Sequence, residues 1–442
     1  IAAVGTDMAE NAVIYEANIR QYSPEGTFNA FTKDIPLLKE LGVKIIWVMP
    51  INPISKVKRK AKGDLFTSDI EDPADREKYL GSYYAVSDYK AINPEFGSLE
   101  DFKNLVATAH KNDIYVIVDW VPNHTGWDHP WIFEHPDYYT QNEAGEIIDP
   151  SNPETGASWG WTDTADLNYS NSAMRTAMID ALKYWVEVAD IDGYRMDVAN
   201  QVPVDFFEKA TASLQEIKPV FMLAEAEQPN LMEKAFDMHY AWEFHHLLND
   251  ISKGHKNLTE LDAYLSKMDT VLAADDINMN FITNHDENSW AGTLAERMPA
   301  QKEIFTALIY TLPGMPLIYS GQEYDLDHRL KFFEKDSFPK TKGPYFELLK
   351  KLGALKKTHP ALHGGKSAAA YKRLKTENSN IFAFKRGKAG REMCFIGNFS
   401  NETQQVQVGY GKLYTDYLQG ETLYLENAPI ELAPWAFKII IE

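Results

Sequence analysis

The chain has 442 residues, a formal net charge of −20 and a hydrophobic content of 44%. So acidic a chain lacks the basic surface that nucleic acid requires, and no apolar run approaches the roughly 18–20 residues of a membrane span, so we expect neither partner. The single cysteine, Cys394, excludes an intramolecular disulfide and any cysteine-based metal centre.

Apolar, β-rich segments alternate with helical patterns along most of the chain, which is typical of βα units around a parallel sheet. The segments that we expect to form strands are 12–19, 43–49, 114–120, 192–197, 220–225, 235–240, 277–284 and 315–320. Helices are expected between them, at 99–111, 174–189 and 305–312. Eight such strands predict an α/β fold of the (β/α)8 TIM-barrel type.

Two connections are too long for plain barrel loops: residues 50–98 and residues 124–169. Connections beyond roughly 12–15 residues are usually functional or form small subdomains. The first contains a basic run, 56–64, which we expect to be a solvated loop. The second contains four tryptophans that either stack on sugars or pack the insertion, and we expect packing for at least half of them: Trp127, Trp131, Trp159 and Trp161.

From residue 362 onward the pattern changes to short alternating strands, expected at 369–376, 380–387, 392–399, 403–410, 421–426 and 433–442. This pattern predicts a separate C-terminal all-β sandwich domain. The expected domains are therefore a catalytic barrel at 1–123 and 170–361, an inserted subdomain at 124–169 after strand three, and the sandwich at 362–442.

Polar side chains follow four of the predicted barrel strands. They are Asp119, Asn123 and His124 after the third strand, Arg195 and Asp197 at the fourth, Glu225 after the fifth, and Asn284, His285 and Asp286 after the seventh. In a parallel barrel the carboxyl ends of the strands line the active site. Arg195 and Asp197 alone could form a structural ion pair, but the full set exceeds what such a pair needs.

Carboxylates of this kind suit cleavage of a glycosidic bond with retention, in which one is the nucleophile and another the proton donor, roughly 5–5.5 Å apart. A neighbouring cation lowers the pKa of a carboxyl group, so Arg195 is expected to keep Asp197 ionised. Glu225 follows an apolar strand and is expected to be unpaired, with a raised pKa, as the acid. Spacing alone leaves Glu227 as an alternative acid.

Four motifs occur in order on these strands: "DWVPNH", "GYRMDVAN", "AEAE" and "FITNHDE". Together they resemble the four sequence regions of the α-amylase superfamily of glycoside hydrolases, and the resemblance covers the whole chain. It implies Asp197 as nucleophile, Glu225 as acid/base and Asp286 as the carboxylate that stabilises the transition state. The resemblance also implies residues that surround the sugar in the −1 subsite, namely His124, Arg195, His285 and Tyr84, the last in "GSYYAVSDY".

The segment "ADLN" resembles the part of the family that can bind calcium, which makes Asp166 and Asn123 candidate ligands. Two side chains are too few for calcium unless backbone carbonyls complete the site. The chain also departs from starch-type α-amylases, which commonly carry Lys-His where this sequence has Asn200 and Gln201. The contacts beyond the cleaved bond are therefore left open.

The resemblance implies retaining hydrolysis of α-1,4-glucosidic bonds in starch, maltodextrins or related α-glucans through a covalent glycosyl-enzyme intermediate. One alternative is a glucosyltransferase or isomerase of the same superfamily. Another is a catalytically silent glycan-binding protein, whose expected mark is loss of the carboxylates. The oligomeric state is left open. Because the sequence starts at Ile1 rather than Met, we expect an extracytoplasmic protein, secreted or periplasmic.

Overall fold

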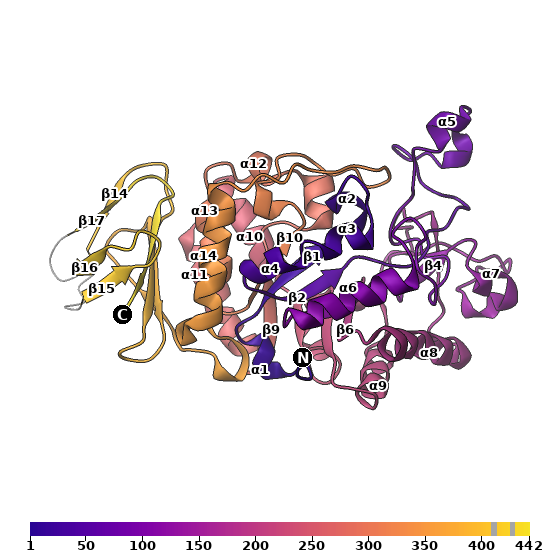
Figure 1. Ribbon diagram of the computed structural model, residues 1–442, viewed down its shortest axis with the longest axis horizontal. Helices are drawn as coiled ribbons and strands as arrows, with labels where there is room; N and C mark the ends of the chain where they lie inside the picture. The colour runs from indigo at the N-terminus through magenta and orange to yellow at the C-terminus, as the bar shows by residue number, and fades with distance from the viewer. Residues whose placement is uncertain (408–412, 425–428) are drawn as a thin grey trace.

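The computed structural model describes residues 1–407, 413–424 and 429–442. In this part of the chain, eight parallel strands close a barrel in the order β1-β10-β9-β8-β7-β6-β3-β2 (Figure 1). They are β1 (Val13–Ala17), β2 (Val43–Val48), β3 (Tyr115–Trp120), β6 (Gly193–Met196), β7 (Phe221–Ala224), β8 (Met238–Tyr240), β9 (Ile277–Asn280) and β10 (Met315–Tyr319). Each lies within a predicted strand, so the predicted (β/α)8 barrel is confirmed.

The strands are buried on both faces because alternate side chains point to opposite sides of a strand. Ile14 of β1, Trp47 of β2 and Leu223 of β7 belong to the apolar cluster that fills the barrel. Tyr15 and Ile46, one position away on their strands, belong instead to the cluster formed with the outer helices. This alternation explains why the strands are apolar throughout.

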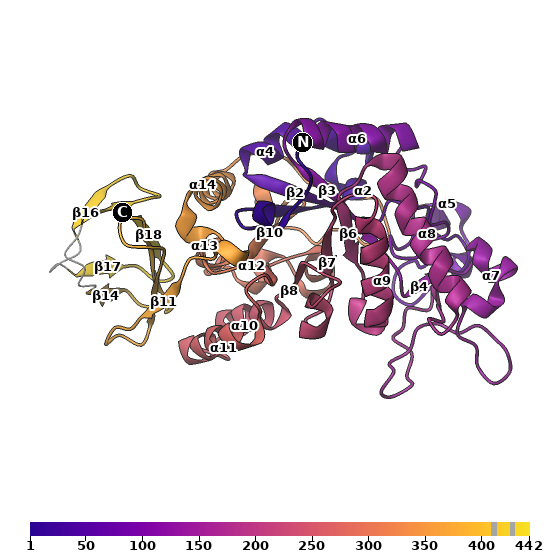
Figure 2. The same ribbon diagram turned by 90° about the horizontal axis from the view of Figure 1, so that it is seen from below.

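The α-helices of the described residues are α1 (Thr6–Ala9), α2 (Ile19–Tyr22), α3 (Phe28–Thr32), α4 (Ile35–Glu40), α5 (Pro73–Arg76), α6 (Leu99–Lys111), α7 (Pro130–Glu134), α8 (Ser172–Ala189), α9 (Val204–Gln215), α10 (Trp242–Ser252), α11 (Leu258–Val271), α12 (Leu294–Arg297), α13 (Lys302–Thr311) and α14 (Pro344–Thr358). Most of them surround the barrel, whereas α5 and α7 lie apart from it (Figures 1 and 2). A capping box between Ser98 and Asp101 fixes the start of α6, which has the predicted bounds. No helix among the described residues is long and apolar enough to cross a membrane.

The segment between β3 and β6 contains α7 and a short antiparallel ribbon of β4 (His124–Gly126) and β5 (Thr164–Asp166). The register of this ribbon places His124 opposite Asp166. In Figures 1 and 2, α5 and α7 lie at the end of the molecule remote from the C-terminal sheets. The ribbon thus joins the outer part of the insertion to the barrel rim.

The C-terminal region forms antiparallel sheets. The larger sheet has the order β11 (Tyr371–Leu374), β12 (Ile381–Arg386), β13 (Met393–Asn398), β18 (Phe437–Ile441), β15 (Leu413–Asp416) and β16 (Thr422–Tyr424), and the smaller pairs β14 (Gln404–Val406) with β17 (Ile430–Leu432). Sequence analysis did not predict β15 and β17. The predicted strands 403–410 and 421–426 contain β14 and β16, and their last residues lie outside the described part of the chain.

The larger sheet is apolar on both faces. Phe384 and Phe395 face the barrel and share its outer apolar cluster with Phe305 of α13. On the opposite face, Ile396 packs in a cluster with Val406 of the smaller sheet. The C-terminal sheets therefore stack on each other and on the barrel helices through continuous apolar contacts, which supports the predicted sandwich.

Candidate active site

A cavity of about 420 Å³ opens at the carboxyl ends of the barrel strands. The predicted residues that line it are Tyr84, His124, Asp197, Glu225, His285 and Asp286. Arg195 lies beneath it and is fully buried. The fold therefore brings together every residue predicted for catalysis or substrate binding, although Tyr84 and Asp286 are 202 positions apart in the sequence.

Close packing of β6 against β7 places Asp197 beside Glu225. Gly193 has φ +151°, and a Cβ atom there would lie 1.8 Å from the carbonyl oxygen of Phe221, so only glycine allows this approach. Val198, directly after Asp197, has φ +46°, which is strained for a β-branched residue. The N–H of Val198 donates to Glu225 Oε1 at 2.8 Å. The strained turn thus helps to hold the Glu225 carboxyl group in place.

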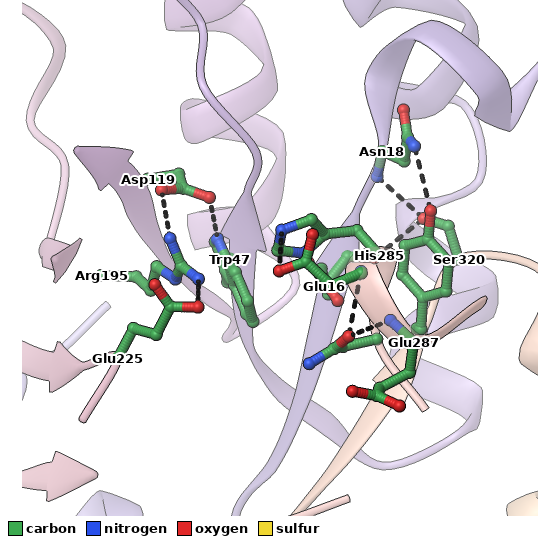
Figure 3. A network of polar contacts seen from close by, with 12 residues as sticks. Glu16, Asn18, Trp47, Asp119, Arg195, Glu225, His285, Glu287 and Ser320 are labelled. Atoms are coloured by element: carbon green, nitrogen blue, oxygen red, sulfur yellow. Dashed lines mark hydrogen bonds and ion pairs between the residues drawn. The ribbon is translucent and has the colours of Figure 1, made fainter. Parts of the chain in front are cut away.

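One guanidinium group, that of Arg195, joins three carboxylates. Nη1 lies 3.0 Å from Asp119 Oδ1 and 2.7 Å from Asp197 Oδ1, and Nη2 lies 3.0 Å from Glu225 Oε2. Nη2 and Nε also donate to the hydroxyl of Tyr240. Figure 3 shows Arg195 between Asp119 and Glu225. The prediction that Glu225 is unpaired is therefore wrong: the side chain of Arg195 is long and forked enough to reach both neighbouring strands.

Burial governs the charge of both candidate catalytic carboxyl groups. It raises the pKa of Asp197 to about 6, although Arg195 acts in the opposite direction. Burial likewise raises the pKa of Glu225 to about 7, again against Arg195. The expected lowering of the Asp197 pKa by Arg195 is thus outweighed by loss of water. The charge of Asp197 also raises the pKa of Glu225, so ionisation of Asp197 helps Glu225 to keep its proton.

Asp119 is a fully buried carboxyl group that the sequence analysis noted at the rim without giving it a role. It accepts hydrogen bonds from Trp47 Nε1 at 3.0 Å and from the Tyr84 hydroxyl at 2.9 Å, in addition to its contact with Arg195. Burial raises its pKa to about 6. Its role is to orient the side chains of Arg195 and Tyr84, both of which it contacts. The sequence signal for this role was an aspartate within an apolar strand.

Tyr84 and His285 form the floor of the cavity. Their rings stack with centroids 5.3 Å apart, and the Tyr84 hydroxyl lies 2.9 Å from His285 Nε2. On its other side, His285 Nδ1 lies 2.5 Å from Glu16 Oε2 (Figure 3). Sequence analysis missed Glu16, and the available signal was a charged residue within the apolar segment Val13–Ala17.

His124 is buried at the edge of the cavity, and burial lowers its pKa to about 3. Asn123 Nδ2 lies 3.1 Å from His124 Nδ1. An amide nitrogen is a donor, so Nδ1 accepts and the proton of the neutral ring resides on Nε2. His124 is therefore set up as a neutral hydrogen-bond donor.

The candidate calcium ligands lie at the base of the insertion, outside the cavity lining. The side chain of Asp166 accepts a hydrogen bond from Thr140 Oγ1 at 2.7 Å, and that of Asn123 contacts His124. The described residues contain no group of three or more His, Cys, Asp or Glu side chains suited to a metal. One carboxylate and one amide do not supply the six to eight oxygens that calcium prefers, so the fit is incomplete and calcium stays a prediction.

The outer wall of the cavity is aromatic on one side and charged on another. The aromatic residues are Trp161, Trp290, Phe332 and Phe333, and the remaining wall includes Lys60, Gly63 and Asp64. Most of the basic run 56–64 is exposed, Gly63 and Asp64 included, as expected for a solvated loop, whereas Lys60 is half-buried. Lys60 Nζ donates to the Gly160 carbonyl at 2.6 Å, which ties the run to the insertion.

The four tryptophans of the insertion fall into two pairs. Trp161 lines the cavity and Trp159 stacks on it, with ring centroids 5.7 Å apart. Trp127 lies under Lys58, and its Nε1 donates to a backbone carbonyl. Trp131 packs against Tyr89. The first pair is placed to meet a ligand, and the second pair holds the insertion together.

Glu227 lies in a second cavity of about 290 Å³, together with Asn200 and Trp242. Glu225 lines both cavities and so stands between them. Glu227 Oε1 accepts from the backbone N–H of Glu243, and burial raises its pKa to about 7. No contact joins it to Arg195 in the described structure. The geometry therefore favours Glu225 over Glu227 as the acid.

The sequence model of the family described as "Alpha amylase, catalytic domain" matches residues 7–358. The chain belongs to the alpha-amylase family. The match begins before β1 and extends to the last residue of α14. It therefore covers the whole barrel of this alpha-amylase family member, together with the insertion that contributes His124 and Trp161.

Solved structures and curated sequences agree with this family. A noncanonic maltogenic alpha-amylase, AmyB, from Thermotoga neapolitana is 26% identical, with a TM-score of 0.84 over 98% of each chain. An alpha-amylase from Lactobacillus plantarum is 27% identical, with a TM-score of 0.84 over 99% of this chain and 100% of that chain.

Among curated sequences, a cyclomaltodextrin glucanotransferase from Bacillus sp. (strain 17-1) is 30% identical over 81% of this chain and 52% of its own length. Alpha-amylase 3 of Dictyoglomus thermophilum is 26% identical over 72% of this chain and 65% of its own length. The chain spans about half the length of the glucanotransferases that it matches.

Proposed function

We propose that this protein is a glycoside hydrolase that cleaves α-1,4-glucosidic bonds in starch, maltodextrins or related α-glucans with retention of configuration. One observation carries the proposal: Asp197 and Glu225 contact the two terminal nitrogens of one guanidinium group and both line the cavity. Two carboxyl groups separated by a single guanidinium are neighbours, as the roughly 5–5.5 Å spacing of retaining enzymes requires.

In the first step, an Asp197 carboxylate oxygen attacks the anomeric carbon. The bond from that carbon to the leaving oxygen breaks, and Glu225 gives its proton to that oxygen. With a pKa of about 6 for Asp197 and about 7 for Glu225, the state in which Asp197 is ionised and Glu225 is protonated predominates only between about pH 6 and pH 7. The products are a β-linked glycosyl ester on Asp197 and a free sugar end.

In the second step, water attacks the same carbon from the opposite face. Glu225, now ionised, takes a proton from the water, and the ester bond to Asp197 breaks. Two inversions restore the α configuration. Asp286 is the third carboxylate of the cavity, and its side chain is 41% exposed, so it can contact the sugar directly. We assign it the role of stabilising the positive charge that develops on the sugar ring.

The floor and edge of the cavity bind the same sugar ring. Tyr84 offers a ring face for stacking, and His124 and His285 present nitrogen atoms at the cavity surface. Arg195 does not line the cavity, so its role is to position Asp197 and Glu225. Calcium is given no part in these steps.

Proton NMR of freshly released product tests the proposal. Maltooligosaccharides should yield the α anomer at early times, before mutarotation, and an early β anomer would contradict it. Product chain lengths should be followed with and without an added acceptor sugar, because hydrolysis releases new reducing ends without one. Products longer than the substrate that appear only with acceptor would instead indicate transfer.

A further inference from the structure

Glu16 is a charged residue built into the interior of the barrel. It lies on β1 two positions after Ile14, so it faces the barrel interior with that residue, and it is fully buried. Its carbonyl oxygen accepts from the backbone N–H of Ser320 at 3.0 Å and from Ser320 Oγ at 2.8 Å. Its side chain is not part of the cavity lining. Glu16 is thus held behind the floor of the site, out of contact with a bound sugar.

The Glu16 carboxylate is directed at His285. Oε2 lies 2.5 Å from His285 Nδ1, and Oε1 has no hydrogen-bond partner among the described residues. A buried carboxylate without a compensating cation is costly, and no other cation contacts Glu16 in the described structure. The contact therefore couples the charge of Glu16 to that of the imidazole.

Other groups also face the imidazole ring. Asp286 Oδ2 lies 3.5 Å from Nε2, and the ring of Trp47 is roughly perpendicular to the imidazole, with ring centroids 6.0 Å apart. Tyr84 stacks on the ring, and its hydroxyl lies 2.9 Å from Nε2 and donates to Asp119, which contacts Arg195. The surrounding carboxylates favour the imidazolium, and Arg195 opposes it.

Together, the groups around His285 favour the protonated, positively charged form of its imidazole ring. Burial by itself lowers the pKa of His285, but Asp286 and Glu16 outweigh burial and raise it to about 10, with Arg195 acting in the lowering direction. The geometry agrees with a raised pKa for His285, because two carboxylates lie within 3.5 Å of the ring nitrogens and neither is paired with Arg195.

We propose that Glu16 is a positioning residue that holds His285 as an imidazolium, so that Nε2 keeps a proton at the cavity floor, where it faces the Tyr84 hydroxyl at 2.9 Å and the bound sugar. A neutral imidazole with its proton shared with Glu16 at Nδ1 would present Nε2 as an acceptor. Only the cation donates from both nitrogens at once. The proposal rests on the proposed glycosidase function for the identity of the bound sugar, whereas the state of His285 does not depend on it.

NMR titration of the histidines of the full chain tests the proposal directly. The imidazole signals of His285 are identified by their loss in His285→Asn. In the parent protein, His285 should remain an imidazolium at pH 8. In Glu16→Gln, which keeps a hydrogen-bond acceptor but removes the charge, the pKa of His285 should fall by roughly 2 units or more.

The pH dependence of turnover on a maltooligosaccharide gives the second readout. The ratio of Glu16→Gln activity to parent activity should be nearly constant below pH 7 and fall by about twofold by pH 8 and about tenfold by pH 9, as His285 loses its proton. Glu323→Gln is the matched control. Glu323 is another buried carboxyl group, at the end of β10, which contacts Tyr15 rather than His285. The ratio of Glu323→Gln activity to parent activity should not fall with rising pH in this way.

Two results would overturn the proposal: a His285 titration in Glu16→Gln that matches the parent, or an activity ratio that is lowered equally at every pH. If Glu16→Gln does not fold, the parent spectrum decides, since a neutral His285 at pH 7 refutes the proposal and an imidazolium supports it. A chain without activity on α-glucans would refute the proposed function alone.

Discussion

The guanidinium group of Arg195 lies 3.0 Å from the carboxylate of Glu225, while the same group contacts Asp197 at 2.7 Å. One fully buried cation is therefore shared by two carboxyl groups that must be in opposite protonation states during the proposed reaction. When Asp197 is ionised, its charge disfavours ionisation of Glu225, so the two groups titrate as a pair. This relationship makes the pH dependence of the protein predictable.

The first prediction is a narrow, bell-shaped pH profile. Activity requires Asp197 ionised and Glu225 protonated, so kcat/KM should rise with pH through about 6 and fall through about 7. Initial rates on a maltooligosaccharide between pH 4 and 9 measure both limbs. A plateau extending to pH 9 would show that the acid does not titrate as Glu225 is expected to do.

The second prediction separates nucleophile from acid. Asp197→Asn should lower kcat by roughly 10⁴-fold or more, since an amide cannot attack the anomeric carbon. Glu225→Gln should lose activity on maltooligosaccharides yet retain turnover of a glycosyl fluoride, whose leaving group needs no proton. Glu227→Gln is the matched control, two residues away in the adjoining cavity, and should keep the pattern of the parent protein. If Glu227→Gln, rather than Glu225→Gln, loses activity on maltooligosaccharides but still turns over the glycosyl fluoride, Glu227 is the acid.

The third prediction concerns Tyr84, which stacks on His285 and donates to Asp119. Tyr84→Ala should lower kcat/KM by roughly tenfold or more, because it removes the ring face on which the sugar rests. Tyr84→Phe keeps that face and loses only the hydroxyl, so its loss should be smaller. Circular dichroism should show both variants folded. Equal losses in the two variants would assign the effect to the hydroxyl rather than to stacking.

The fourth prediction links catalysis to stability. The pKa of an aspartate is about 3.9 in an unfolded chain, whereas that of Asp197 in the folded protein is about 6. The folded state thus binds the proton more tightly, so Asp197 destabilises it increasingly as pH rises from about 4 through about 6. Asp197→Asn should therefore raise the free energy of unfolding at pH 8 by on the order of 1 kcal/mol and have less effect at pH 4. Thermal melts at both pH values test this, and a lower Tm for the variant at pH 8 would contradict it.

The fifth prediction tests calcium at Asn123 and Asp166. If calcium binds there, removing it with a chelator should lower Tm, because a ligand that binds only the folded state stabilises that state. The loss would be about 2.7 kcal/mol for a site filled at 100 times its Kd. In Asp166→Asn the response to chelator should shrink. An identical Tm with and without chelator would leave Thr140 as the partner of Asp166 and remove calcium from this site.

The barrel could be predicted from the sequence alone, together with six of the residues that line the cavity: Tyr84, His124, Asp197, Glu225, His285 and Asp286. Each barrel strand is a short apolar segment bounded by polar residues, and the alternation of strands and helices leaves few ways to bury both faces of the sheet. Asp197, Glu225 and His285 could be predicted because the carboxyl ends of parallel strands meet at one rim. Strands β15 and β17 were missed because they have only four and three residues.

The pairing of the charges, in contrast, depends on the folded structure. In the sequence, Arg195 is two residues from Asp197 and 30 residues from Glu225, yet the closed barrel places it within reach of both. Glu16 lies 269 positions from His285, and they meet because β1 and β9 both adjoin β10 in the closed barrel. Charge interactions and desolvation depend on distance and burial in space, which local sequence patterns do not encode.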